Sequence, residues 1–229
     1  MGQLFIISTP IGNLSDISLR AISTLKEADV VFSENPNTTR KLLTKYDLKC
    51  NLKKYNQHAS DKVLQEIFSF LKAEKKVALV SEAGTPGISD PGSKLVSDVR
   101  ENLAETIITP IPGASALSTL LSVAGIGTDK FLFLGFLPHK KGRQKVIQEI
   151  IESNYSVVLY ESKHRLLKLL EELKNHGLKD RKILIGREMT KLNETFYFDL
   201  VENLEEYFKN NPVENKGEFS MVIKKAAKS

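Results

Sequence analysis

The chain has 229 residues, 41% of them hydrophobic and 27% charged, which is enough for one large domain or two small ones. Its apolar runs are only about four residues long, so no segment approaches the roughly 20 residues of a membrane-spanning helix. The 33 Lys and Arg residues outnumber the 28 Asp and Glu residues, giving a formal net charge of +5. This small excess favours an acidic partner only weakly.

The first residues contain no basic segment followed by a long apolar run, so no secretory signal peptide is expected. Cys50 is the single cysteine, which excludes an internal disulfide and suits a reducing compartment. We therefore expect a cytoplasmic protein. No metal site is expected either, because no metal-ligand spacing is formed by Cys50 with His58, His139, His164 and His176.

Short apolar runs alternate with segments of helical periodicity through the first half of the chain. Helical periodicity follows Ser15 and Asp16, and again follows Ser60 and Asp61, all of which can cap a helix. The expected strands are nearly continuous in apolar residues, as buried parallel strands are, and lie at 4–7, 30–32, 77–80 and 106–111. This alternation predicts an α/β fold with a mostly parallel sheet.

A flexible polar segment at 125–129, after an expected helix of small residues at 114–124, marks the predicted domain boundary. The two predicted domains are residues 1–124 and 125–229. A mixed sheet is expected in the second, because the strand at 196–201 partly alternates in polarity and lies close to the last strand. The expected elements are strands at 131–136, 156–160, 183–186, 196–201 and 218–223, with a helix at 164–175 that Gly177 ends.

The segment 81–92 is the most informative in the chain. It follows a predicted buried strand directly and precedes a predicted helix, so it lies at a strand's carboxyl end, where open α/β sheets bind ligands. Its three Gly allow close backbone approach to a ligand, and its two Pro stiffen the loop. Neither a Walker-type phosphate loop nor a dinucleotide Gly-x-Gly-x-x-Gly motif is present. A plain turn is the alternative interpretation.

Two further loops have the same character. Residues 9–13 follow the first predicted strand, and residues 111–116 follow the fourth and open a helix of small residues. Each loop alone is weak evidence, since Pro and Gly are common in loops. Three such loops at strand ends of one sheet would line one edge and form one site.

Five segments together resemble the ribosomal RNA small subunit methyltransferase I family, whose fold is similar to that of the tetrapyrrole methylases. The resemblance spans nearly the whole chain, in order, and the loop at 81–92 is its most specific part. The segments are Ser-Thr-Pro-Ile-Gly-Asn-Leu-Ser-Asp-Ile-Ser-Leu-Arg-Ala at 8–21, the loop at 81–92, Pro-Ile-Pro-Gly-Ala-Ser-Ala at 110–116, Phe-Leu-Phe-Leu-Gly-Phe-Leu-Pro at 131–138 and Tyr-Glu-Ser-Lys-His-Arg at 160–165.

The resemblance implies a two-domain α/β enzyme, usually a homodimer, that methylates a cytidine 2′-hydroxyl in 16S ribosomal RNA. S-adenosyl-L-methionine is the implied cofactor, bound in the cleft between the domains and held mostly by loop backbone. Carried over by position, the cofactor-binding residues would be Pro10, Gly84, Thr85, Ile88, Ala114, Ser115, Tyr160 and Gly186, with Glu161 beside Tyr160.

The chain departs from the family pattern in two places near the expected site. Where the family commonly has Ala-Glu-Asp-Thr-Arg, residues 33–37 read Ser-Glu-Asn-Pro-Asn, which keeps Glu34 but loses an acid and a base. Any RNA-binding role of those two lost side chains is therefore not carried over. Glu82 stands where Asp is usual, which is a one-carbon change with a mild expected effect.

Methyl transfer from a sulfonium is an in-line displacement with an activated leaving group, so alignment and exclusion of water are the protein's main work. A ribose hydroxyl is a poor nucleophile, and a general base could assist it. Glu161, at a predicted strand end, and Asp90, in the long loop, are the candidate bases. The alternative for Asp90, which precedes Pro91, is that it only forms the turn.

A basic segment follows the strand expected at 131–136. Lys140, Lys141, Arg143 and Lys145 place four positive charges within six residues, next to His139, and contact with RNA phosphates would explain them. A solvated helix start is the alternative. Further candidates for RNA binding are Arg40, His164 and Arg165.

Three functions are therefore considered. The first is 2′-O-methylation of RNA in the small ribosomal subunit, which the basic segment and the loop sequences favour. The second is methylation of a small tetrapyrrole. The third is a ribosome assembly factor that keeps the fold without catalysis, which the altered segment 35–37 makes conceivable.

Overall fold

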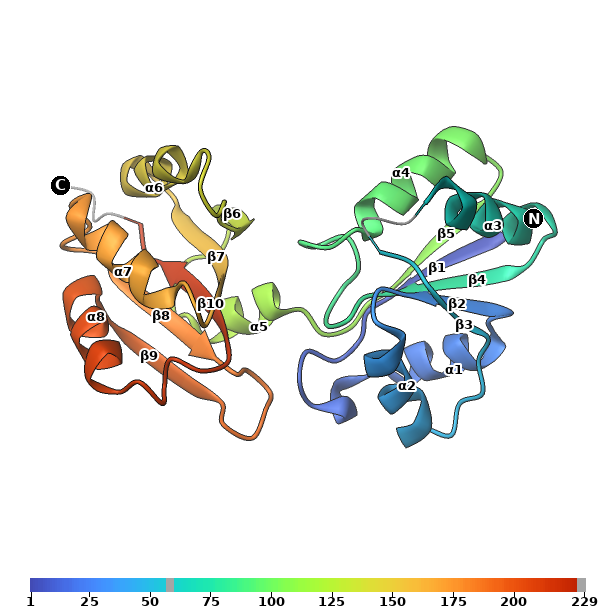
Figure 1. Cartoon of the computed structure of the whole chain (residues 1–229), viewed down its shortest axis with the longest axis horizontal. Coiled ribbons are helices and arrows are strands. Elements are labelled where there is room, and N and C mark those ends of the chain that lie inside the picture. The colour runs from blue at the N-terminus through green and yellow to red at the C-terminus, as the bar shows by residue number, and fades with distance from the viewer. Residues whose placement is uncertain (57–59, 226–229) are drawn as a thin grey trace. The chain divides into compact units, whose positions relative to one another are not determined.

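The computed structural model describes residues 1–56 and 60–225, so His58 lies outside the described residues. The chain divides into two compact units, Met1–Ser115 and Ala116–Ser229, each a sheet with helices (Figure 1). The expected break at 125–129 lies after helix α5 (Ala116–Val123), whereas the observed division precedes it. This helix groups with the second unit because it packs against that unit's strand β10 (Glu218–Ile223).

The first unit contains a five-stranded parallel sheet in the order β3-β2-β4-β1-β5. Its strands are β1 (Gln3–Ile7), β2 (Val30–Ser33), β3 (Leu52–Lys54), β4 (Lys76–Val80) and β5 (Ile107–Ile111). The predicted parallel sheet is confirmed, while the short edge strand β3 had not been expected. Because all five strands run the same way, all their carboxyl ends lie at one edge of the sheet.

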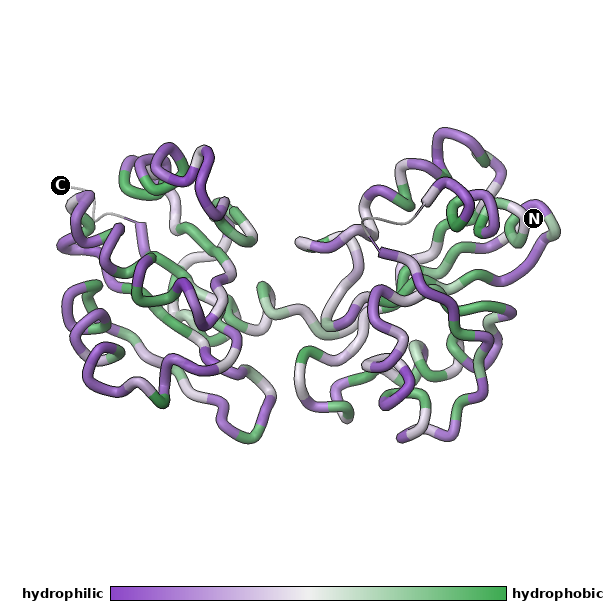
Figure 2. The backbone as a smooth tube through the Cα atoms, in the orientation of Figure 1, coloured by the Kyte–Doolittle hydropathy of each residue, from purple (hydrophilic) through white to green (hydrophobic). Residues whose placement is uncertain are grey.

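Helices cover both faces of this sheet, as the near-continuous apolar strands require (Figures 1 and 2). Leu25 and Leu42 pack on one face, and Ile67 and Leu95 pack on the other. The helices are α1 (Leu19–Glu27) and α2 (Pro36–Lys45) on the first face, and α3 (Asp61–Lys72) and α4 (Gly92–Asn102) on the second.

The start of α1 differs from the sequence prediction. Residues Leu14–Asp16 form a separate 3-10 turn, in which the backbone N–H of Ser15 donates to Asn13 Oδ1 at 3.0 Å. Ser18 is the true cap of α1, since its Oγ accepts from the N–H of Ala21 at 3.1 Å. Ser15 and Asp16 therefore belong to the turn and do not cap the helix.

The second unit has a mixed sheet in the order β6-β7-β10-β8-β9, in which only β6 and β7 are parallel. The expected mixed sheet is confirmed, but the strand at 196–201 pairs with β8 and not with the last strand, because β10 lies between β7 and β8. The remaining elements are β6 (Phe131–Phe136), α6 (Arg143–Glu152), β7 (Ser156–Ser162), α7 (Leu166–Asn175), β8 (Lys182–Arg187), β9 (Thr195–Leu200) and α8 (Val201–Asn210). Of the helices in the described ranges, none combines the length and the apolar character needed to cross a bilayer.

Candidate functional site

Three loops meet at the carboxyl edge of the first unit's sheet. Strand β1 pairs with both β4 and β5 in parallel, so the loops that follow these strands leave the same edge. Thr9, after β1, and Gly84, after β4, form an isolated backbone bridge with N–H to O distances of 2.9 and 3.0 Å. The predicted convergence of these loops on one edge is confirmed.

The Thr85 hydroxyl joins all three loops. Its Oγ1 donates to the carbonyl oxygen of Ala114, after β5, at 3.1 Å, and lies 2.9 Å from the hydroxyl of Ser8, after β1. Because the single hydroxyl proton of Thr85 goes to Ala114, the Ser8 hydroxyl is the donor in the second hydrogen bond. A residue expected to bind the cofactor therefore also fixes the geometry of the edge.

Two glycines allow these loops to approach so closely. Gly84 has a φ of +83°, a conformation that L side chains rarely adopt, and a Cβ there would lie 3.3 Å from Ile11. A Cβ at Gly113 would lie only 2.9 Å from Cβ of Ser8. Closely packed main-chain atoms therefore form this edge, which suits a cofactor that is bound by the backbone of the loops.

Asp90 shapes the long loop. Its Oδ1 accepts from the backbone N–H groups of Gly87 and Gly92, at 2.6 and 2.7 Å, just before α4 begins. Burial raises the pKa of this carboxyl, and the two hydrogen bonds oppose that rise. The turn-forming role of Asp90 is thus observed directly, and it involves one of the two carboxylate oxygens.

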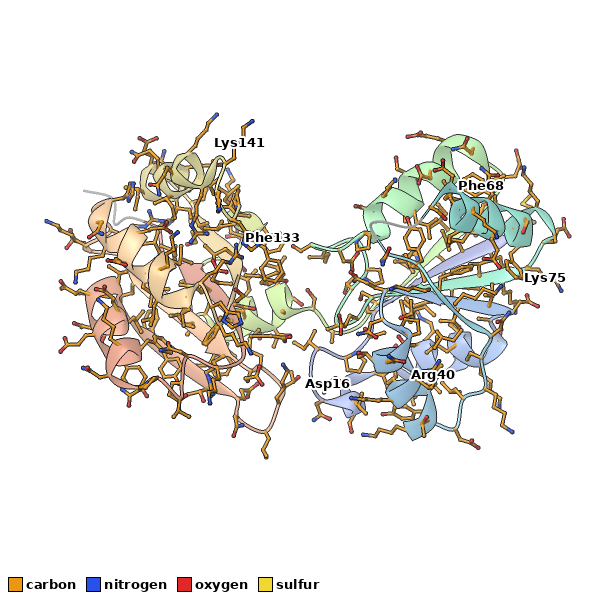
Figure 3. All side chains as sticks on the ribbon, viewed as in Figure 1. Asp16, Arg40, Phe68, Lys75, Phe133 and Lys141 are labelled. Atoms are coloured by element: carbon orange, nitrogen blue, oxygen red, sulfur yellow. The ribbon has the colours of Figure 1, made fainter. Side chains whose placement is uncertain are left out.

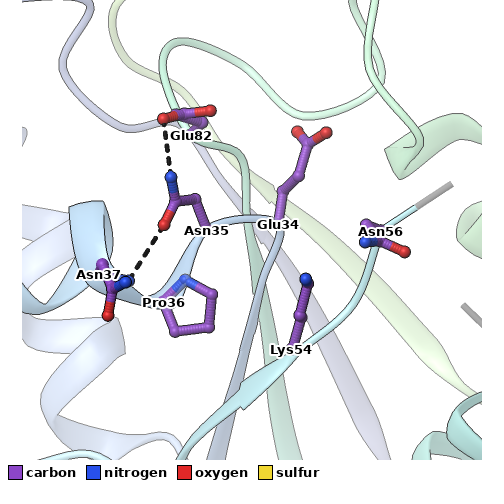
Figure 4. A pocket seen from close by; sticks show the side chains of 7 residues that line it. All are labelled: Glu34, Asn35, Pro36, Asn37, Lys54, Asn56 and Glu82. Carbon is purple, nitrogen blue, oxygen red and sulfur yellow. Dashed lines mark hydrogen bonds between the residues drawn. The ribbon is translucent and has the colours of Figure 1, made fainter. Parts of the chain in front are cut away.

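A pocket of about 560 Å³ opens at the same edge, beyond β2, β3 and β4 (Figure 4). Glu82 accepts hydrogen bonds from Asn35 Nδ2 at 3.0 Å and from Thr38 Oγ1 at 3.2 Å, and so connects α2 to the long loop. We name this opening the β2 pocket; its lining residues are Glu34, Asn35, Pro36, Asn37, Lys54, Asn56 and Glu82.

Glu34 in the β2 pocket has a perturbed carboxyl group. Burial raises its pKa, and the nearby carboxylates of Asp90 and Glu82 raise it further. From the sequence alone, Glu34 was identified only as a retained family residue and was not placed in the site. Its position directly after β2, at the edge where the other loops end, was the available signal.

In the second unit, Glu161 lies inside a network of buried charges. Its side chain is fully buried at the end of β7, with Oε1 2.6 Å from Arg165 Nε and Oε2 3.7 Å from Arg143 Nη1. Arg143 also pairs with Glu172 at 2.8 Å. The proposed role of Glu161 as a general base is not supported, because the carboxylate is held between two guanidinium groups and lacks an exposed face.

The same network corrects the assignment of Arg143 and Arg165 as phosphate ligands. Arg165 Nη1 donates to the carbonyl oxygen of Leu137 at 2.8 Å, and Arg143 Nη1 donates to that of Pro138 at 3.2 Å. Arg143 is only 3% exposed, and the Arg165 side chain is 14% exposed. Both guanidinium groups therefore point inward and fix the backbone that precedes the basic residues.

The other RNA-binding candidates are exposed. His139, Lys140 and Lys141 lie on the loop before α6, and His164 lies after β7. Arg40 belongs to α2 in the first unit, where its Nη1 donates to Asn37 Oδ1 at 3.0 Å (Figure 3). Four basic side chains of the predicted segment are thus accessible to an anionic partner, namely His139, Lys140, Lys141 and Lys145.

The remaining cofactor candidates are distributed over both units. Pro10 is buried in the first loop, and Ile88, Ala114 and Ser115 are half-buried at the loop edge. Tyr160 is 9% exposed, with ring centroids 5.2 Å from Phe133 and 5.5 Å from Phe136, and Gly186 is buried in β8. Among the residues that the structure describes, no three His, Cys, Asp or Glu side chains are placed to hold a metal ion.

A parallel sheet followed by a mixed one is the fold of a known class of protein. The chain belongs to the family of Tetrapyrrole (Corrin/Porphyrin) Methylases, whose model matches residues 3–205. Within that class it belongs with the proteins named Ribosomal RNA small subunit methyltransferase I. The one from Thermotoga maritima is 41% identical over 225 residues, which cover 97% of this chain and 98% of the relative.

Solved structures of the class share the fold. The methyltransferase CobJ matches with a TM-score of 0.73 at 18% identity, over 99% of this chain and 95% of that one. Uroporphyrin-III C-methyltransferase from Thermus thermophilus, in complex with S-adenosyl homocysteine, matches with a TM-score of 0.67 at 16% identity, over 96% of this chain and 97% of that one. The expected fold class is thereby confirmed.

Replacement of Glu161 by Ala is expected to destabilise the second unit by about 3 kcal/mol, because the Arg165 guanidinium loses its counter-charge and Arg143 keeps that of Glu172 alone. Chemical denaturation measures this difference. Glu149→Ala, at an exposed position on the neighbouring helix α6, is the control and should change stability little. A loss below about 1 kcal/mol for Glu161→Ala would contradict the proposed charge network.

Replacement of Glu34 by Gln is expected to stabilise the protein at neutral pH. A carboxyl whose pKa is higher in the folded chain binds its proton more tightly there, so its charged form opposes folding above that pKa. The gain in stability should disappear as the pH falls below 4.5, the ordinary pKa of a Glu carboxyl. Thermal denaturation across this range, with the exposed Glu105→Gln as control, measures the effect. A gain that did not depend on pH would contradict this explanation.

Proposed function

We propose that this protein transfers a methyl group from S-adenosyl-L-methionine to the 2′-hydroxyl of a cytidine in 16S ribosomal RNA of the small subunit. The observation that carries the proposal is the contact of three loops through Thr85 at one sheet edge. It occurs in a chain 41% identical to a protein named Ribosomal RNA small subunit methyltransferase I. A cytoplasmic homodimer is part of the same proposal.

The residues at the loop edge suit a cofactor held by backbone atoms. A Thermus thermophilus protein of the same fold is described as complexed with S-adenosyl homocysteine. We assign cofactor binding to Pro10, Gly84, Thr85, Ile88, Ala114 and Ser115 of the first unit and to Tyr160 and Gly186 of the second. The closely packed backbone around Gly84 and Gly113 supports this assignment.

When bound, S-adenosyl-L-methionine supplies a methyl group on a positively charged sulfur, which leaves as a neutral thioether. The loop edge aligns this methyl group with the ribose oxygen and excludes water. Asp90 is the proposed acceptor of the hydroxyl proton as the O–C bond forms and the C–S bond breaks. Its raised pKa makes it a stronger base than an ordinary Asp, and the turn uses only its Oδ1.

RNA binding is assigned to exposed basic residues on both units. His139, Lys140, Lys141 and His164 belong to the second unit, and Arg40 belongs to the first. Arg143 and Arg165 contribute indirectly, because they hold the carbonyl groups of Pro138 and Leu137 beneath the basic loop. Contacts of this kind position RNA through its phosphates and make affinity depend on salt.

Transfer of labelled methyl groups to small ribosomal subunits that lack the modification tests the proposal. Incorporation at a cytidine 2′-oxygen is the expected result. Incorporation into a tetrapyrrole acceptor instead would identify a small-molecule methylase. Failure of the protein to bind S-adenosyl-L-methionine in calorimetry would leave only the non-catalytic assembly factor.

Replacement of Thr85 by Val is expected to weaken S-adenosyl-L-methionine binding about tenfold, because the three loops lose the hydroxyl that joins them. Isothermal calorimetry measures the dissociation constant. Thr44→Val removes a comparable hydroxyl, which donates to the carbonyl of Arg40 within α2, and is the matched control. Equal affinities for the two variants would argue against a joining role for Thr85.

Reversal of charge at Lys140 and Lys141 together is expected to weaken RNA binding and lower the slope of log affinity against log salt by about 2. Cofactor affinity should stay at the wild-type value. The control is the double variant Lys26→Glu and Lys72→Glu, at exposed positions in the last turns of α1 and α3. An unchanged slope for the loop variant would remove these residues from the RNA-binding surface.

A further inference from the structure

The proposed cofactor and phosphate contacts do not involve the β2 pocket, so its role is a separate question. It is lined by residues from the ends of β2 and β3, from the start of α2 and from the loop after β4 (Figure 4). At about 560 Å³ it is large enough for a nucleoside. The inference below rests on the proposed function, because it concerns the substrate of that reaction.

The pocket contains both a hydrogen-bond acceptor, the Glu34 carboxylate, and a charged hydrogen-bond donor, the Lys54 ammonium group. Asn35 and Glu82 are bonded to each other at 3.0 Å and form part of the wall. Glu34 enters from the end of β2 and presents a carboxylate, and Lys54 enters from β3 and presents an ammonium group. A ligand that carries a hydrogen-bond donor next to hydrogen-bond acceptors could bond to Glu34 and to Lys54 at once.

The pocket adjoins the loop that carries the proposed reaction. Glu34 and Asp90 together line a small cavity of about 10 Å³, with Ser81 and Pro86 of the long loop. The charge of Asp90 also acts on the Glu34 carboxyl. A base bound in the β2 pocket would therefore place its ribose next to Asp90 and the loop edge.

An enzyme that modifies one nucleotide in a folded RNA must hold that nucleotide outside its stack and read the edge of its base. Cytosine presents an amino donor at position 4 beside acceptors at N3 and O2. We propose that the β2 pocket binds the cytosine base of the substrate, with Glu34 accepting from the 4-amino group and Lys54 donating to the acceptor side.

This arrangement discriminates between the two pyrimidines. Uracil presents a carbonyl oxygen at position 4, which would face the Glu34 carboxylate with no proton between them. The unpaired and mutually repelling oxygens disfavour uracil. Glu34 is therefore a specificity-determining residue.

The variant Glu34→Gln tests this assignment, because its amide can turn either an oxygen toward cytosine or an amino group toward uracil. Methylation is measured on small subunits that carry cytidine or uridine at the modified position. Wild type should prefer cytidine by a factor of about 50, and the variant should reduce that preference about tenfold. Glu105→Gln is the matched control, exposed and outside the pocket, and should keep the wild-type preference. A Glu34→Gln enzyme that keeps the full preference would overturn the proposal.

Binding of mononucleotides separates this proposal from the proposed activity. Cytidine monophosphate, titrated into the wild-type protein, should shift the NMR signals of Lys54 and Asn56, while uridine monophosphate should not. In Glu34→Gln the two responses should become similar. If the cytidine response occurs without any methyl transfer to RNA, the proposed activity fails and the base pocket stands. Equal responses in the wild type, or no response to either nucleotide, would overturn the pocket assignment.

Discussion

The loop edge exists because β1 pairs in parallel with both β4 and β5. This pairing brings three loops from distant parts of the sequence to one edge, where the Thr85 hydroxyl bonds to one loop and accepts from another. Gly84 and Gly113 let the backbones approach where a side chain would collide. The result is a rigid edge of main-chain donors and acceptors, which suits recognition of a nucleoside cofactor by shape and hydrogen bonds.

In the second unit, buried charged side chains fix the position of a segment that carries exposed charged side chains. Glu161 lies between Arg143 and Arg165, and the two arginines bond to the backbone at residues 137 and 138. Burying charged groups is unfavourable unless they are paired, so this network specifies one arrangement of the segment that it holds. Lys140 and Lys141 are presented to solvent from that segment. Within one basic sequence, the buried arginines therefore hold the backbone in place, and the exposed lysines face solvent.

The sequence predicted the features that depend on local pattern. Continuous apolar strands with Gly and Pro at their ends were enough to expect a parallel sheet and the convergence of loops 9–13, 81–92 and 111–116. It could not show that Arg143 is buried, because its partner Glu172 comes from a helix 29 residues further along the chain. Glu34 was missed as a site residue for a similar reason, since the β2 pocket needs β3, a short strand without a clear apolar pattern.

A crystal structure of the full chain with S-adenosyl-L-methionine would locate the cofactor on this edge or elsewhere. We expect main-chain atoms of residues 84–88 and 114–115 within hydrogen-bond distance of the cofactor, with its methyl group directed toward Asp90. A cofactor bound elsewhere on the chain, with these loops making no contact to it, would rule out the loop edge as the cofactor site.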